Sequence, residues 1–257
     1  MDDAFDSPRI LVNRAREHIE EASGEVKAFF NTRPFTRVVD FDPKTHQDVH
    51  KIRLTSKLPT SVAAIVKDAT SNLRDALDHA VYASALRLVG GDPRHTGFPF
   101  AKDAAGVIGE LSGKRLRDNP PEIRLFLASL EPHEAGNRLL CGLNRIRNPN
   151  THRILVPVGT AAMADNSHMR RAVVTGGIQF GYSRWDAANN EVEFLRIGRG
   201  SVFDYNVQVF FRIVFGEVDI LCGEDAFSTL SEIAGIVDGI INGIESETSR
   251  ILRERSM

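Results

Sequence analysis

The sequence is poor in cysteine and has no long apolar run. Its 257 residues include two cysteines, Cys141 and Cys222, which stand far apart in apolar stretches. This arrangement favours buried thiols over a disulfide framework or a zinc knuckle, and it is typical of a reducing compartment. The most apolar stretch, 233–244, is interrupted by Asp238 and Asn242 and is too short to span a bilayer. Because the N-terminus also lacks a basic start followed by an apolar core, we predict a cytoplasmic protein without membrane contact.

The net charge is close to zero, and several common catalytic motifs are absent. The formal net charge is −2 at pH 7, so a nucleic-acid partner would have to meet a local basic patch. The sequence contains no glycine-rich nucleotide loop, no G-x-S-x-G nucleophile turn, no H-E-x-x-H and no paired C-x-x-C. The usual signatures of nucleotide hydrolases, α/β-hydrolases and zinc proteases are therefore excluded. We predict no cofactor and no metal.

Two hydrophobic periods divide the chain. Apolar residues recur at steps of three or four positions in three long segments, which predicts amphipathic helices. In the β-rich block the period changes to two, and β-branched and aromatic residues accumulate, which predicts antiparallel strands. The predicted elements are long helices at 7–31, 60–89 and 225–253, shorter helices between 102 and 148, a β-hairpin at 34–57 and the β-rich block at 152–216.

Helices and strands are segregated along the chain and do not alternate strictly, which favours the α+β class. We predict a single domain over 1–257, in which long helices pack on an antiparallel meander sheet. The helical part covers about 1–148 and contains the hairpin as an N-terminal insertion. The length and a composition of 42% hydrophobic and 26% charged residues are typical of a globular protein with a sizeable core.

Basic and amide side chains crowd the junction between the helical part and the β-rich block, in the stretch LNRIRNPNTHR at 143–153. Within it, Arg147, Asn148 and His152 form an R-N-x-x-x-H pattern. The pattern resembles the short signature of the HEPN superfamily, many of whose members resemble metal-independent ribonucleases. The resemblance implies that His152 moves protons at the attacking or leaving oxygen and that Arg147 stabilises charge on the phosphate. The alternative is a helix C-terminus, whose carbonyls attract basic side chains.

Arginine is concentrated in segment 135–185, which holds seven arginines and one acidic residue. Such a local excess, mixed with aromatic residues, suits a surface that contacts phosphates. The expected ligand is RNA or a phosphorylated molecule, and solvated arginines on the outer face of a sheet are the alternative. The predicted phosphate-binding residues are Arg145, Asn148, Arg153, Arg170 and Arg171.

The second long helix carries a polar stripe beside its apolar face. Asn72, Asp75 and His79 lie on one side of it at steps of three and four positions. Arg74 and Asp78 are four residues apart, which predicts a surface ion pair of small energetic value. We interpret the stripe as a hydrogen-bonded seam and not as half of a metal site, because no second helix of this kind occurs.

Three segments together resemble a pattern found in a group of bacterial proteins. They are LRDALDHAVY at 73–82, GFPF at 97–100 and the His152-Arg153 pair at the junction. The resemblance covers 72–155 and supports the fold and the choice of residues, but it implies no particular reaction.

Two functions remain open from the sequence. The first is a protein directed at nucleic acid or phosphate, with a HEPN-like ribonuclease as its enzymatic form. The second is a non-enzymatic binding or interaction protein, in which the polar stripe and the junction form one buried network. A homodimer is included among the expected assemblies.

Overall fold

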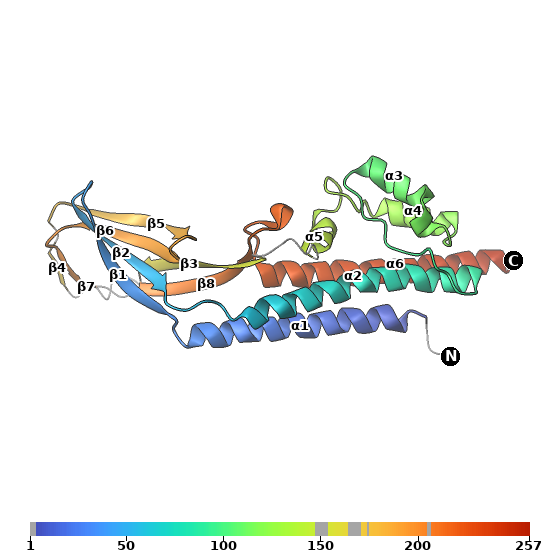
Figure 1. Cartoon of the computed structure of the whole chain (residues 1–257), viewed down its shortest axis with the longest axis horizontal. Helices are drawn as coiled ribbons and strands as arrows, with labels where there is room; N and C mark the ends of the chain where they lie inside the picture. The colour runs from blue at the N-terminus through green and yellow to red at the C-terminus, as the bar shows by residue number, and fades with distance from the viewer. Residues whose placement is uncertain (1–3, 147–153, 164–170, 174, 205–206) are drawn as a thin grey trace. The chain divides into compact units, whose positions relative to one another are not determined.

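The computed structural model describes residues 4–146, 154–163, 171–173, 175–204 and 207–257. It confirms the α+β class (Figure 1) and divides into two compact units. The helical unit comprises Met1–Gly24, Thr60–Leu155 and Phe215–Met257, and the β unit comprises Glu25–Pro59 and Val156–Val214. The N-terminal hairpin therefore groups with the β-rich block and not, as its place in the sequence predicts, with the helical part.

The helical unit is built on long helices that run side by side in Figure 1, namely α1 (Asp6–Asn31), α2 (Thr60–Val89) and α6 (Ala226–Arg255). The last turns of α1, from Glu25 on, belong to the β unit. Their apolar stripes are buried, as their three- and four-residue spacing predicted. Polar contacts fix the helices to one another. The buried hydroxyls of Ser84 and Thr248 are hydrogen bonded at 2.8 Å between α2 and α6. Arg16 Nη2 of α1 lies 3.1 Å from Asp238 Oδ2 of α6.

Helix ends follow local signals in the sequence. The carboxylate of Asp225 accepts a hydrogen bond from the Ser228 backbone N–H at 3.0 Å and caps α6. Gly243 of α6 permits a close approach by α4, because a Cβ at this position would lie 2.6 Å from Cζ of Phe126. The shorter helices are α3 (Ala104–Ser112), η1 (Lys114–Leu116), α4 (Pro121–Ser129), α5 (Arg138–Ile146) and η3 (Asp219–Leu221).

The β unit contains a four-stranded sheet in the order β1-β2-β6-β5 and the two-stranded pairs β3-β8 and β4-β7. The hairpin strand β2 pairs antiparallel with β6, so the sheet is not a simple meander of consecutive strands. The short strand β7 was not predicted. The strands are β1 (Phe35–Asp42), β2 (Gln47–Leu54), β3 (Leu155–Met163), β4 (Arg171–Val173), β5 (Ile178–Asp186), β6 (Glu191–Gly198), β7 (Val202–Asp204) and β8 (Val207–Phe215).

The apolar core of the β unit lies on one face of the four-stranded sheet. Ile52 of β2 and Val192 and Leu195 of β6 are buried there, and Phe211 of β8 packs against them. The ring of Phe30, near the end of α1, stacks on Phe211 with 4.7 Å between centroids. Aromatic and branched side chains therefore hold the hairpin, β6 and β8 together.

Candidate functional site

The predicted reactive pair at the junction follows directly after α5, which ends at Ile146. Arg145 is the member of the predicted phosphate-binding set whose side chain is described. Arg171 lies in β4, where the backbone alone is described. The remaining predicted residues, Arg147, Asn148, His152, Arg153 and Arg170, lie outside the described residues.

Arg145 is held by two carboxylates. Its Nη2 donates to Glu134, and its Nη1 lies 3.4 Å from Oδ2 of Asp219. The Asp219 side chain is 83% exposed, so this second contact is strongly screened by water. The guanidinium of Arg145 is therefore partly neutralised by Glu134 before any ligand arrives.

A pocket of about 270 Å³ opens beside α5, and we call it the α5 pocket. No described carboxylate lies within ion-pair distance of the Lys102 ammonium, and the Asn144 side-chain amide has no hydrogen-bond partner among the described residues. The exposed Lys102 ammonium and the exposed Asn144 amide therefore share the pocket with the ion pair of Arg145 and Glu134. It is lined by Phe100, Ala101, Lys102, Glu134, Cys141, Asn144 and Arg145.

The thiol of Cys141 in this pocket is protonated at neutral pH. Burial raises its pKa, and the charge of Glu134 adds to the effect, so that the pKa is about 11. Since the thiolate is the nucleophilic form of cysteine, Cys141 is a poor nucleophile. The second cysteine, Cys222, is exposed.

The polar stripe of α2 does not form one buried face. Asn72 and Asp75 are half-buried, and His79 is exposed. The predicted ion pair does form, with 2.6 Å between Arg74 Nη1 and Asp78 Oδ1. It is not a surface pair, because Arg74 is only 5% exposed. Spacing within one helix did not reveal this burial, which results from tertiary packing.

The GFPF segment, which the sequence pattern singles out without giving it a contact, meets this ion pair. The Asp78 carboxylate accepts a hydrogen bond from the Phe98 backbone N–H at 2.7 Å, and the Arg74 guanidinium lies over the Phe100 ring, 4.6 Å from its centroid. The GFPF segment is therefore fixed to α2 by Arg74 and Asp78. No local pattern could pair these positions, because the loop reaches the helix only in the folded chain.

A second pocket, of about 480 Å³, lies between α1 and α2, and we call it the α1–α2 pocket. Ser7 Oγ of α1 is 2.8 Å from His79 Nδ1 of α2 at its wall. The hydroxyls of Tyr82 and Thr96 have no hydrogen-bond partner among the described residues. The lining residues are Ala4, Ser7, Asp78, His79, Tyr82 and Thr96.

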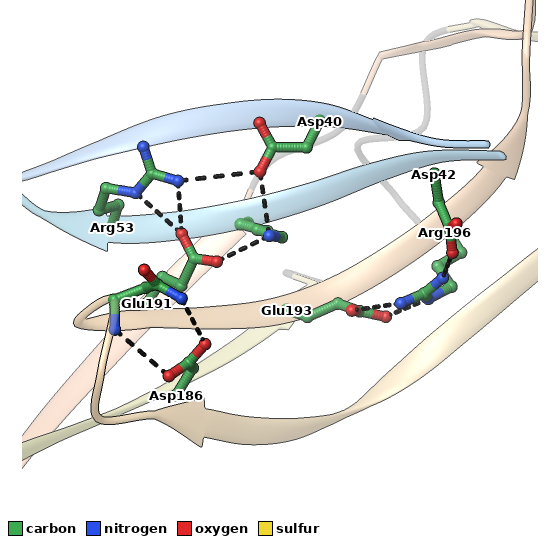
Figure 2. A network of polar contacts seen from close by, with 9 residues as sticks. Asp40, Asp42, Arg53, Asp186, Glu191, Glu193 and Arg196 are labelled. Carbon is green, nitrogen blue, oxygen red and sulfur yellow. Dashed lines mark hydrogen bonds and ion pairs between the residues drawn. The ribbon is translucent and has the colours of Figure 1, made fainter. Parts of the chain in front are cut away.

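Among the described residues, the densest charged network covers the polar face of the four-stranded sheet (Figure 2). Glu191 of β6 is buried and accepts hydrogen bonds from Lys51 Nζ at 2.7 Å and from Arg53 Nε at 2.8 Å. Asp40 of β1 lies 3.0 Å from the same Lys51 ammonium. Burial alone would lower the pKa of Lys51, but the bonds to Glu191 and Asp40 outweigh it and raise that pKa. This network joins three neighbouring strands, so its evident role is structural.

A second part of the network joins β1 to β6. Arg196 Nη1 donates to Asp42 Oδ2 at 2.7 Å, and Arg196 Nη2 donates to Glu193 Oε2 at 2.8 Å (Figure 2). The backbone N–H of Lys44 and the Arg196 guanidinium lower the pKa of Asp42 to about 2. Every basic group in these two clusters faces a carboxylate, which weighs against a phosphate site on this face.

The described residues contain no group of three or more His, Cys, Asp or Glu side chains placed to hold a metal ion. None of the helices within the described part of the chain combines the length and apolar character needed to cross a membrane. No family model, curated protein or solved structure matches the chain.

Proposed function

We propose that the protein binds a phosphate-bearing ligand, RNA foremost, at the α5 pocket. The observation that supports this function is that the Lys102 ammonium and the Asn144 amide, neither of which has a partner among the described residues, line one pocket with the Arg145 guanidinium. An ammonium and an amide both donate hydrogen bonds to phosphate oxygens. The pocket is small enough that one phosphate group with its sugar would fill it, leaving the rest of the ligand outside.

The enzymatic form of the proposal is metal-independent RNA cleavage. Arg147 and His152 follow Arg145 within seven residues in the sequence, and the proposal assigns the reaction to this R-N-x-x-x-H segment. In this mechanism His152 takes the proton from the attacking 2′-hydroxyl, and Arg147 stabilises the charge that builds on the phosphate.

Binding is tested with a fluorescein-labelled single-stranded RNA in polarisation titrations at two salt concentrations. Lys102→Ala should weaken binding about fivefold and reduce the magnitude of the salt slope by about 0.7, the value for one lost contact on a single strand. Lys67→Ala is the matched control, because Lys67 is exposed on α2 and does not line the α5 pocket. Wild-type protein without salt-dependent RNA binding would overturn the whole proposal.

Cleavage is tested with the same RNA in the presence of EDTA. We expect His152→Ala and Arg147→Ala each to lower the rate by at least about a hundredfold while RNA binding is retained. A His152→Ala protein that cleaves RNA at the wild-type rate would refute the ribonuclease assignment. It would leave the binding proposal standing, since binding is measured separately.

A second candidate function is a non-enzymatic binding or interaction protein with a structural polar network. Its supporting observation is that Asp78 and His79 of α2 are engaged by Phe98 and Ser7. In that case Asp78→Ala or Arg74→Ala should lower stability by about 1 to 3 kcal/mol, because each leaves the other member of the ion pair without its partner on α2. A melting temperature unaltered by both substitutions would count against this function.

A further inference from the structure

Ser7 and His79 are placed as a nucleophile and a base are placed in acyl-transfer enzymes. Ser7 Oγ lies 2.8 Å from His79 Nδ1, within the range that proton transfer needs. Ser7 lies in the first turn of α1 and His79 lies in the second half of α2, and both residues are exposed, so that a substrate can reach them. Positions held in this way on helices keep their geometry better than positions on loops.

The surroundings of the pair suit a small neutral ligand. The α1–α2 pocket, at about 480 Å³, is within the size range of small-molecule sites. Among the described lining residues Asp78 carries the one carboxylate, and it is already paired with the buried Arg74. The free hydroxyls of Tyr82 and Thr96 are hydrogen-bond donors without a structural task among the described residues.

We propose that the α1–α2 pocket is an acyl-transfer site for small carboxylic esters, with Ser7 as the nucleophile and His79 as the general base. In the tautomer that carries its proton on Nε2, His79 accepts the Ser7 hydroxyl proton at Nδ1 while Ser7 Oγ bonds to the ester carbonyl carbon. The hydroxyls of Tyr82 and Thr96 donate to the oxyanion that forms.

The remaining steps return the site to its starting state. The bond from the carbonyl carbon to the alcohol oxygen breaks, and the leaving alcohol takes the proton from the His79 imidazolium. Water then attacks the acyl group on Ser7 Oγ, with His79 again accepting a proton. The carboxylic acid leaves, and the Ser7 hydroxyl is restored. This activity is independent of phosphate binding at the α5 pocket.

The test uses full-length protein, a fluorophosphonate probe and p-nitrophenyl butyrate. Mass spectrometry should find the probe on Ser7, and ester hydrolysis should exceed that of the Ser7→Ala variant at least tenfold. His79→Ala should lower both labelling and hydrolysis at least tenfold. Ser129→Ala is the matched control, because Ser129 is exposed on α4 and does not line the pocket.

Folding is checked by circular dichroism for each variant, and Tyr82→Phe offers a milder change that removes one oxyanion donor. It should lower hydrolysis at least threefold without changing the site of labelling. An unlabelled wild-type protein, or equal labelling of wild type and His79→Ala, would overturn the proposal. If the wild type is not labelled and Ser7→Ala lowers the melting temperature, the Ser7 hydroxyl serves only as a tertiary contact.

Discussion

Replacing Glu191 by glutamine should weaken the β unit, because this one carboxylate joins β6 to the hairpin. Its side chain is 6% exposed and lies 2.7 Å from Lys51 Nζ and 2.6 Å from Arg53 Nη2. Glutamine keeps the size but removes the charge, so two charge-assisted hydrogen bonds become ordinary ones or are lost. Such bonds contribute about 1.5 to 3 kcal/mol each, and the partial exposure of both cations reduces the sum, so we expect a loss of about 2 kcal/mol.

The single tryptophan of the chain, Trp185, provides the assay. It lies in β5 directly opposite Val192, the residue after Glu191, so its fluorescence reports unfolding of this sheet. With a urea dependence of about 2 kcal/mol per molar, a loss of about 2 kcal/mol lowers the unfolding midpoint by about 1 M. Far-UV circular dichroism in the same titration follows the helices.

Asp40→Asn is the matched control for this experiment. Asp40 contacts the same Lys51 ammonium, but its side chain is 46% exposed, so its loss should cost clearly less than the loss of Glu191. A Glu191→Gln midpoint equal to that of wild type would refute the argument that burial makes this carboxylate important. A larger effect of Asp40→Asn than of Glu191→Gln would refute it as well.

Three further predictions concern other parts of the chain. Gly239→Ala in α6 should raise stability by up to about 1 kcal/mol, since a Cβ there meets no atom within 4 Å. Gly243→Ala should lower stability, because its Cβ would clash with Phe126 of α4. Melting temperatures of the two variants, compared with wild type, test both directions. At pH 8, Ellman's reagent should modify exposed Cys222 at least about tenfold faster than buried Cys141, and equal rates would contradict the environment assigned to Cys141. The pKa of Asp42 is lowered from 3.8 to about 2, so its contribution to stability is present above pH 3.8 and is lost as the pH falls toward 2. Asp42→Asn should therefore lose less stability than wild type over that range in acid unfolding experiments.

The helices could be predicted from the sequence because their signals are local. Three- and four-residue spacing located α1, α2 and α6 to within a few residues. Asp225 marked the start of α6, because an aspartate that caps a helix bonds to a backbone N–H only three residues further on. The pairing of β2 with β6 could not be predicted, because paired residues such as Lys51 and Glu193 are far apart in the sequence. Two-residue periodicity identifies a strand but not its neighbour.

For the candidate sites, too, the sequence predicts residues with a local pattern and misses residues that meet only in the fold. Arg145 and His79 were selected from their sequence surroundings, and each lines a pocket. Lys102 and Ser7 were missed because nothing near them in sequence distinguishes them from surface residues. Ser7 meets His79 across 72 positions, a relation that no motif of fixed spacing describes. A site whose residues come from separate helices can be recognised only when the fold is known.

Glu134 provides the sharpest test of where a phosphate would bind, because it forms an ion pair with Arg145 and lines the same pocket. Glu134→Gln releases the guanidinium and removes a negative charge that would repel the ligand. At the effective dielectric of a protein surface, with solvent screening, this change amounts to about 1 kcal/mol, or about fivefold tighter RNA binding.

The same substitution carries its own internal control. Because the Glu134 charge contributes to the raised pKa of Cys141, removing it should lower that pKa and speed the reaction of Cys141 with Ellman's reagent. Asp219→Asn, which removes the exposed and more distant carboxylate, should tighten RNA binding less than Glu134→Gln. A Glu134→Gln protein with faster thiol reaction and unchanged RNA affinity would show that the pocket was altered and that the phosphate binds elsewhere.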